Sequence, residues 1–261
     1  MDLVAAILLG GFLSAHFVLG GADVGLGMLL PYLGRDGSER RAVRGAMAPG
    51  CLEHEAWLVA AAAVLLGCFP ELAARLADGT LPLVLLPLGA AWLLRAAGLW
   101  WPGPRGGHSG DALLVTGSWL LAAGWGWLLA SLLAETHHSP APALAGAVTG
   151  AAVGALFLAH GLGYAALRLT GPPFQRARLL TGGQAGRHSF LLTSVVMAAL
   201  PLPAGFRLPL LEEAAATGPF ERVLLPALLA TLPLLFTAQV RRLRGAPLRR
   251  PVNDPYKETR S

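Results

Sequence analysis

Ionisable side chains inside long apolar stretches are the residues of this sequence best placed to do chemistry. They are His16, Asp23, Glu53, His54, Glu55, Arg95 and His160. On insertion scales, a charged group at the centre of a membrane helix costs roughly 2.5–3.5 kcal/mol, so each of these residues needs a reason to be there. Buried carboxylates and imidazoles commonly serve proton paths or ion pairs, and these are the two chemistries to look for.

Asp23 lies in a glycine-rich stretch that runs from Gly20 to Gly27. Glycines in a membrane helix allow a second helix to approach closely. The carboxylate then has two possible roles. It faces a partner or a hydrated proton path, or it is held by a nearby arginine or a helix terminus.

A second acidic group, Glu53-His54-Glu55, opens an apolar run two residues before Trp57. Acidic side chains suit a helix N-terminus because the helix dipole is positive there, so capping is one interpretation. Glu53 and Trp57 are four residues apart and therefore share a helix face. The alternative is a proton path or a subunit interface, for which the candidates are Asp23, Glu53, Glu55, Trp57 and His16. The spacing does not match H-E-x-x-H, so we predict no metal site.

His16 and His160 each stand alone on an apolar stretch. Histidines inside helical bundles can ligate haem, but a lone histidine is more often packed and hydrogen-bonded. The sequence also contains no phosphate-binding loop, dinucleotide fingerprint or nucleophile elbow. We therefore predict no catalytic residue and no cofactor-binding residue in this chain.

The elements that must position these side chains are apolar helices. Of the 261 residues, 54% are hydrophobic and 13% are charged, about half the charge of a soluble domain. Seven apolar runs are long enough, or nearly so, to cross a bilayer: 3–31, 51–70, 80–101, 112–133, 142–168, 188–206 and 222–240. Alternating polarity of the barrel type is absent. We predict an all-α polytopic transmembrane helical bundle of about seven spans.

Arginine clusters follow the first, third, fifth and seventh runs, whereas the other connections contain few basic residues. Cytoplasmic loops of membrane proteins carry an excess of Lys and Arg. This pattern predicts a multi-pass protein of the plasma membrane with its N-terminus outside and its C-terminus cytoplasmic. The formal net charge is +5, but the basic residues lie between apolar runs, so we predict membrane lipid as the surrounding partner and no nucleic acid.

An internal similarity predicts two helical repeats. Phe12-Leu13-Ser14-Ala15-His16 resembles Phe157-Leu158-Ala159-His160, and each precedes a glycine-rich stretch and a basic loop. Repeats of this kind are common in membrane proteins, although chance similarity between apolar helices is the alternative. The predicted transmembrane domain covers 1–250, with repeats at about 1–135 and 140–245. The polar residues 251–261 are predicted to be disordered.

Several short motifs together resemble one known family. They are Gly21–Pro31, Leu33–Asp36, Glu39–Arg41, Ala48–Pro49, Glu55–Leu58, Phe69–Pro70, Leu94–Ala96, Gly117–Leu120 and Ala166–Gly171. Together these motifs resemble those of subunit II of cytochrome bd-type quinol oxidases, and the resemblance is most specific over residues 10–130.

The resemblance implies a non-catalytic subunit of a respiratory-chain oxidoreductase. In that family, subunit I binds the haems, oxidises quinol and reduces oxygen to water, while subunit II braces it and helps supply protons or oxygen. Subunit I would then be the partner of this chain, and quinol would reach it only through the complex. The chain departs from the family at Gly20 and Leu52, where the family usually has acids. These losses favour a structural role for Asp23 over a proton relay.

Two other functions fit a polytopic helical protein. One is a stand-alone transporter or permease that reuses the fold, which would show substrate flux by the isolated chain. The other is an independent haem-binding membrane cytochrome, which would show a haem absorption band that depends on His16 or His160.

Overall fold

The computed structural model describes residues 2–47, 51–78, 82–100, 108–134, 140–182, 186–208 and 210, with six isolated positions between 226 and 237. Throughout these ranges the secondary structure is helical and contains no strand. The helices are α1 (Asp2–Leu33), α2 (Gly37–Met47), α3 (Cys51–Cys68), α4 (Pro70–Ala77), α5 (Pro82–Trp100), α6 (His108–Leu133), α7 (Ala143–Arg168), α8 (Gly171–Thr181), α9 (Gly186–Ala199) and α10 (Leu202–Arg207).

Five segments of the described chain are long and apolar enough to cross a membrane. They are Leu3–Leu33, Pro82–Trp100, His108–Leu133, Ala143–Arg168 and Gly186–Arg207. The prediction of an all-α polytopic bundle is therefore confirmed. The seventh predicted span, 222–240, lies outside the described residues except for isolated positions, as does the tail 251–261.

The second predicted span, 51–70, is shorter and more sharply bent than expected. Helix α3 ends at Cys68, and α4 leaves it at an angle of 107°. Pro70 is the first residue of α4, where the missing N–H of proline costs nothing, whereas inside a continuous helix it would remove a hydrogen bond. Together α3 and α4 count as a sixth span only if the bent pair is taken as one.

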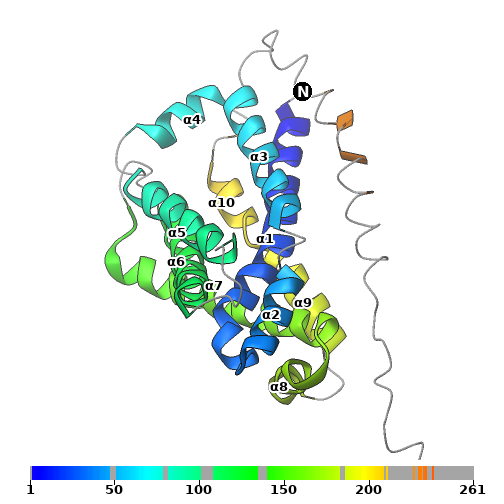
Figure 1. Ribbon diagram of the computed structural model, residues 1–261. Helices are drawn as coiled ribbons and strands as arrows, with labels where there is room; N and C mark the ends of the chain where they lie inside the picture. Colours follow the sequence, from blue (N-terminus) through cyan, green and yellow to red (C-terminus); the bar gives the residue numbers. More distant parts are fainter. Residues whose placement is uncertain are drawn as a thin grey trace, which may run out of the picture.

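Helix α1 is the central element of the bundle. Its 32 residues extend about 48 Å, more than the hydrocarbon thickness of a bilayer. It packs against α3, α6, α7 and α9. Gly25 of α1 and Gly161 of α7 lie so close that a side chain at either position would collide with the backbone of the other helix. Figure 1 shows α4 near the N-terminal end of α1, and α2 and α8 near its other end.

Both halves of the chain follow a similar order of elements. A long helix (α1 or α7) is followed by an 11-residue helix (α2 or α8), a further apolar helix (α3 or α9), a bend and a short helix (α4 or α10). Proline marks both bends, at Pro70 and at Pro201. This order is compatible with the predicted repeats, which remain a prediction.

Candidate functional site

Asp23 is buried inside the bundle and is paired with a histidine. Its residue surface is 1% exposed, and its Oδ2 atom lies 2.9 Å from Nδ1 of His54. The contact has the length of an ion pair without the directionality of a hydrogen bond, and neither carboxylate oxygen accepts a hydrogen bond from the described residues. The structure gives Asp23 a partner on a second helix, the imidazole of His54 on α3.

His54 reaches Asp23 because the first turns of α3 pack against the middle of α1. The residue is 6% exposed, so it belongs to the interior rather than to a solvated helix end. Capping alone does not explain this acidic segment. The neighbouring Glu55 is half-buried, and the side chain of Glu53 lies outside the described part of the chain.

His16 extends the same site along α1. His16, Gly20 and Asp23 are spaced i, i+4 and i+7 and share one helix face. Nδ1 of His16 lies 3.2 Å from the backbone carbonyl of His54, which fixes the imidazole against α3. A side chain at Gly20 would begin 3.4 Å from the His16 ring, in contact with it. Position 20, where the related family usually has an acid, therefore lies directly beside this histidine.

Two further charges complete the site. Arg95, on α5, is 3% exposed, and Arg95 and Glu55 both lie within electrostatic range of His16. We call His16, Asp23, His54, Glu55 and Arg95 the intramembrane cluster. His54 and Arg95 were identified in the sequence as ionisable side chains within apolar runs, but they were not among the five proton-path or interface candidates.

Trp57 has a packing role. It is 7% exposed, and its ring lies 5.9 Å from that of Phe12 on α1. Trp125 of α6 packs on the other side of α1, with ring centroids 4.9 Å from Phe17 and 5.7 Å from His16. These aromatic contacts fix the rotation of α1 and thereby aim His16 and Asp23 toward α3.

The second membrane histidine, His160, has neutral surroundings. Its Nε2 lies 2.8 Å from the backbone carbonyl of Val18, and its Nδ1 lies 2.8 Å from the hydroxyl of Thr193. The ring stacks on Phe190 at 4.7 Å with an interplanar angle of 12°. The expectation of a packed, hydrogen-bonded histidine is confirmed here, and both ring nitrogens already have partners.

A separate polar network joins the helix ends farthest from the N-terminus, and we call it the α2 clamp. On one side of α2, Arg44 donates to Asp111 Oδ1 at 2.7 Å and to the backbone carbonyls of Gly98 and Leu99. Arg40 contributes a second ion pair, with its Nε 3.2 Å from Asp111 Oδ2. The clamp thus ties α2 to the last turn of α5 and the first turn of α6.

On its other side, the clamp ties α2 to α8. Arg176 makes two hydrogen bonds to the carboxylate of Glu39, at 2.7 and 2.9 Å, and also donates to the carbonyl of Leu33, the last residue of α1. Asp36 caps α2 by accepting hydrogen bonds from the backbone N–H groups of Ser38 and Glu39. Two residues of the motif Glu39-Arg40-Arg41 therefore have structural roles. Glu39 pairs with Arg176, and Arg40 pairs with Asp111.

The electrostatics of the α2 clamp favour the charged forms. The hydrogen bonds from Arg176, followed by that from the Arg35 backbone N–H, hold the pKa of Glu39 below its ordinary value. The Ser38 hydroxyl, followed by the Glu39 N–H, similarly lowers the pKa of Asp36. Glu39 in turn raises the pKa of Arg176. These groups stay ionised at neutral pH.

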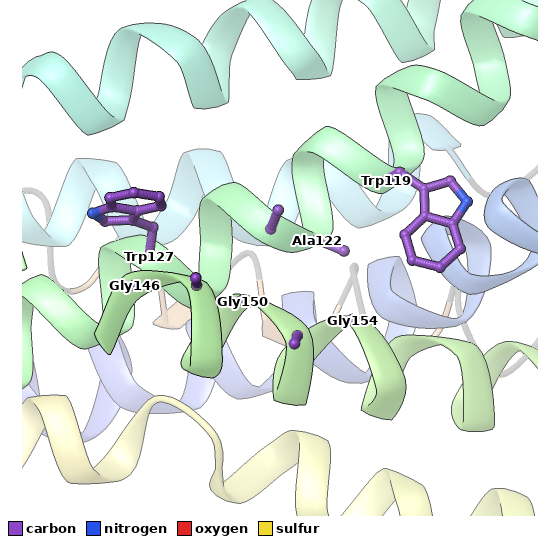
Figure 2. A pocket seen from close by; sticks show the side chains of 9 residues that line it. Trp119, Ala122, Trp127, Gly146, Gly150 and Gly154 are labelled. Atoms are coloured by element: carbon purple, nitrogen blue, oxygen red, sulfur yellow. The ribbon is translucent and has the colours of Figure 1, made fainter. Parts of the chain in front are cut away.

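An apolar cavity of about 220 Å³ lies between α6 and α7. Figure 2 shows Trp119 and Trp127 at its two ends and the glycines Gly146, Gly150 and Gly154 along the α7 wall. Its lining contains no acid, base or thiol. The cavity can hold an apolar chain but no chemistry, and within the described ranges no three His, Cys, Asp or Glu residues gather to bind a metal.

Comparison with known families agrees with the motif resemblance. The family model described as cytochrome bd terminal oxidase subunit II matches residues 1–249, nearly the whole chain. A search of curated proteins finds no match.

Proposed function

We propose that this chain, which belongs to the cytochrome bd terminal oxidase subunit II family, is the non-haem membrane subunit of a quinol:oxygen oxidoreductase complex. In this proposal a partner, subunit I, binds the haems, oxidises quinol and reduces oxygen to water. The chain itself performs no catalytic step. It braces subunit I and aids the access of protons or oxygen. The observation that carries the proposal is the family match over residues 1–249.

The surroundings of the two membrane histidines support a non-haem role. A haem ligand must direct one imidazole nitrogen at the iron. At His160 both nitrogens are already engaged, by Val18 and Thr193. At His16 one nitrogen contacts the His54 carbonyl, and the ring packs against Phe17 and Trp125. Haem ligation by either residue would require these contacts to be rebuilt.

The α2 clamp supports the bracing role. Its arginines satisfy carbonyl groups at the ends of α1 and α5, which would otherwise lack intrahelical partners. Because the clamp ties α1, α2, α5, α6 and α8 at one end, it fixes the spacing of α1 and α5, two of the three helices that carry the intramembrane cluster. A bundle with fixed spacing can present a constant surface to a second subunit.

The proposed orientation places the α2 clamp in the cytoplasm and the N-terminus outside the plasma membrane. The basic residues of α2 and α8 gather at one end of the bundle, as the positive-inside rule requires of a cytoplasmic face. A protease-cleavable tag placed after Ser261 should stay protected from protease added outside intact cells. Ready cleavage of that tag would contradict the orientation.

Affinity purification followed by haem spectroscopy tests the function. The tagged chain should co-purify with a haem-bearing membrane subunit, and the complex should consume oxygen when supplied with quinol. Replacing His16 and His160 together with glutamine should leave the haem content per assembled complex unchanged. Loss of one haem per assembled complex, or haem bound by the isolated chain, would show the assignment of haem to the partner to be wrong.

A further inference from the structure

We infer that Asp23 and His54 together hold one exchangeable proton, which makes the pair a proton-binding site inside the membrane part of the bundle. This site would give the proposed role in proton access a location. Proton binding by the pair does not depend on the proposed function, but the delivery of that proton to an oxidase does. The site is distinct from the neutral His160 site on the other side of α1.

Asp23 is buried, which makes its charge costly. An ionised carboxylate that leaves water loses several kcal/mol of hydration energy unless an opposite charge or hydrogen bonds replace it. At Asp23 no hydrogen bond from the described residues does so, and His54 Nδ1 lies 2.9 Å from Oδ2. One proton neutralises the pair, whether it sits on the imidazole or on the carboxylate.

The surroundings of the pair are charged. His16 on α1 contacts His54 through the backbone, and Glu55 on α3 and Arg95 on α5 lie within electrostatic range of His16. With both histidines neutral, two carboxylates face one guanidinium, and the cluster carries one net negative charge. One added proton makes the cluster neutral. The net charge of the cluster is therefore −1 without the proton and zero with it.

The proton is free to come and go. Binding of a proton to Asp23 breaks no hydrogen bond, because neither carboxylate oxygen accepts one from the described residues. The proton binds to an oxygen or to a nitrogen lone pair, and no bond between heavy atoms changes. His54 stays in place in both states, since its backbone carbonyl contacts His16 Nδ1 independently of its side chain.

The contrast with His160 shows why the same chemistry is not assigned there. The partners of that ring are a backbone carbonyl and a threonine hydroxyl, which carry no charge. No carboxylate among the described residues contacts it. A second proton on His160 would leave a buried positive charge without a counter-ion.

pH-difference infrared spectroscopy of the full chain in lipid nanodiscs tests the inference without any oxidase activity. The wild-type spectrum should contain a protonated-carboxyl band that is absent from D23N. In H54N the side-chain amide keeps a donor near the position of Nδ1 but cannot become charged. We expect the titration midpoint of the carboxyl band to move by about one pH unit or more, the usual effect of a charged neighbour.

The matched control is H160N, which should leave the midpoint unchanged. If D23N fails to fold, the comparison of H54N with H160N decides alone. A band that persists in a folded D23N chain, or equal midpoints in the wild type, H54N and H160N, would overturn the inference. If the band behaves as expected but the chain recruits no haem-bearing partner, the proposed function fails and the proton site stands.

Discussion

The intramembrane cluster holds a buried acidic side chain and the α2 clamp holds partly buried ones, and the two regions pair these acids with different bases. Asp23 faces the imidazole of His54, whereas Asp111 and Glu39 face the guanidinium groups of Arg44 and Arg176. An imidazole changes its charge near neutral pH, while a guanidinium stays charged. The difference separates a pair that can exchange a proton from pairs that can only hold helices together.

The two regions also use the backbone differently. In the α2 clamp, the arginines reach past the carboxylates to the carbonyl groups at the ends of α1 and α5. In the intramembrane cluster, the backbone contact runs through the His54 carbonyl to His16, and the Asp23 oxygens accept no hydrogen bond from the part of the chain that the structure describes. In the α2 clamp, the ionised carboxylates thus have hydrogen-bond partners, whereas the carboxylate of the intramembrane cluster has none among the described residues.

The largest effect is expected for Asp23→Ala. This change leaves His54 and the buried Arg95 with one negative charge fewer and opens a gap beside α3. Removing one partner of a buried pair costs about 3–5 kcal/mol. Thermal unfolding of the full chain in mild detergent measures the loss. Asp23→Asn keeps the volume but removes the same charge, so it should lose most of this stability as well, and an Asp23→Asn variant as stable as the wild type would contradict the charge argument.

The next largest effect is expected for Arg44→Met in the α2 clamp. The methionine retains an apolar stem but removes hydrogen bonds to Asp111 and to the end of α5. A hydrogen bond to a charged group contributes about 1.5–3 kcal/mol, so we expect a loss of that size in the same unfolding assay. The control is Arg41→Met on the exposed face of α2, which should stay within about 0.5 kcal/mol of the wild type.

Acid pH should weaken the α2 clamp through Glu39. Because its folded-state pKa lies below the unfolded value of 4.5, Glu39 stabilises the fold fully above that pH. The contribution is lost as pH falls through the folded-state pKa, when the carboxyl binds a proton and its ion pair with Arg176 weakens. The melting temperatures of the wild type and Glu39→Gln should therefore differ at pH 7 and converge on acidification.

The control for this pH dependence is Glu71→Gln, at an exposed position of α4. Its melting temperature should follow that of the wild type across the same pH range. A difference between the wild type and Glu39→Gln that persists unchanged in acid would show that Glu39 acts through packing rather than through its charge.

The sequence predicted the helices well because apolar runs of about 20 residues leave few alternatives in lipid. Five of the seven predicted runs coincide with membrane-length helices, and a sixth coincides with the bent helix pair. The bend after Cys68 was the exception, since a proline within an apolar run signals a break but not its angle. Hydropathy measures how apolar a segment is, and the path of the chain depends on packing as well.

The site was only partly predictable. Asp23 and His16 stood out because each interrupts an apolar run, and the structure brings both to His54. The pairing itself depends on how α3 is positioned along α1, and that position comes from contacts such as Phe12 with Trp57 rather than from local spacing. The preference for a structural role of Asp23 over a proton relay, drawn from the acids missing at Gly20 and Leu52, stays a prediction.

The smallest effect is expected at the neutral histidine, where Thr193→Val removes the hydroxyl that faces His160. The valine keeps the shape of the side chain, and Nε2 of the histidine keeps its contact with the Val18 carbonyl. A neutral hydrogen bond contributes about 1 kcal/mol to stability, so the loss should be of that order and well below that of Asp23→Ala. The threonine hydroxyl also contacts the carbonyls of Ser189 and Phe190 within its own helix, so its loss exposes no charge. Because no ion is involved, the stability difference between Thr193→Val and the wild type should stay constant from pH 6 to 8, as unfolding curves at several pH values would show. A difference that varies with pH in this range would mean that His160 also changes its protonation state, and the distinction between the two membrane histidines would then fail.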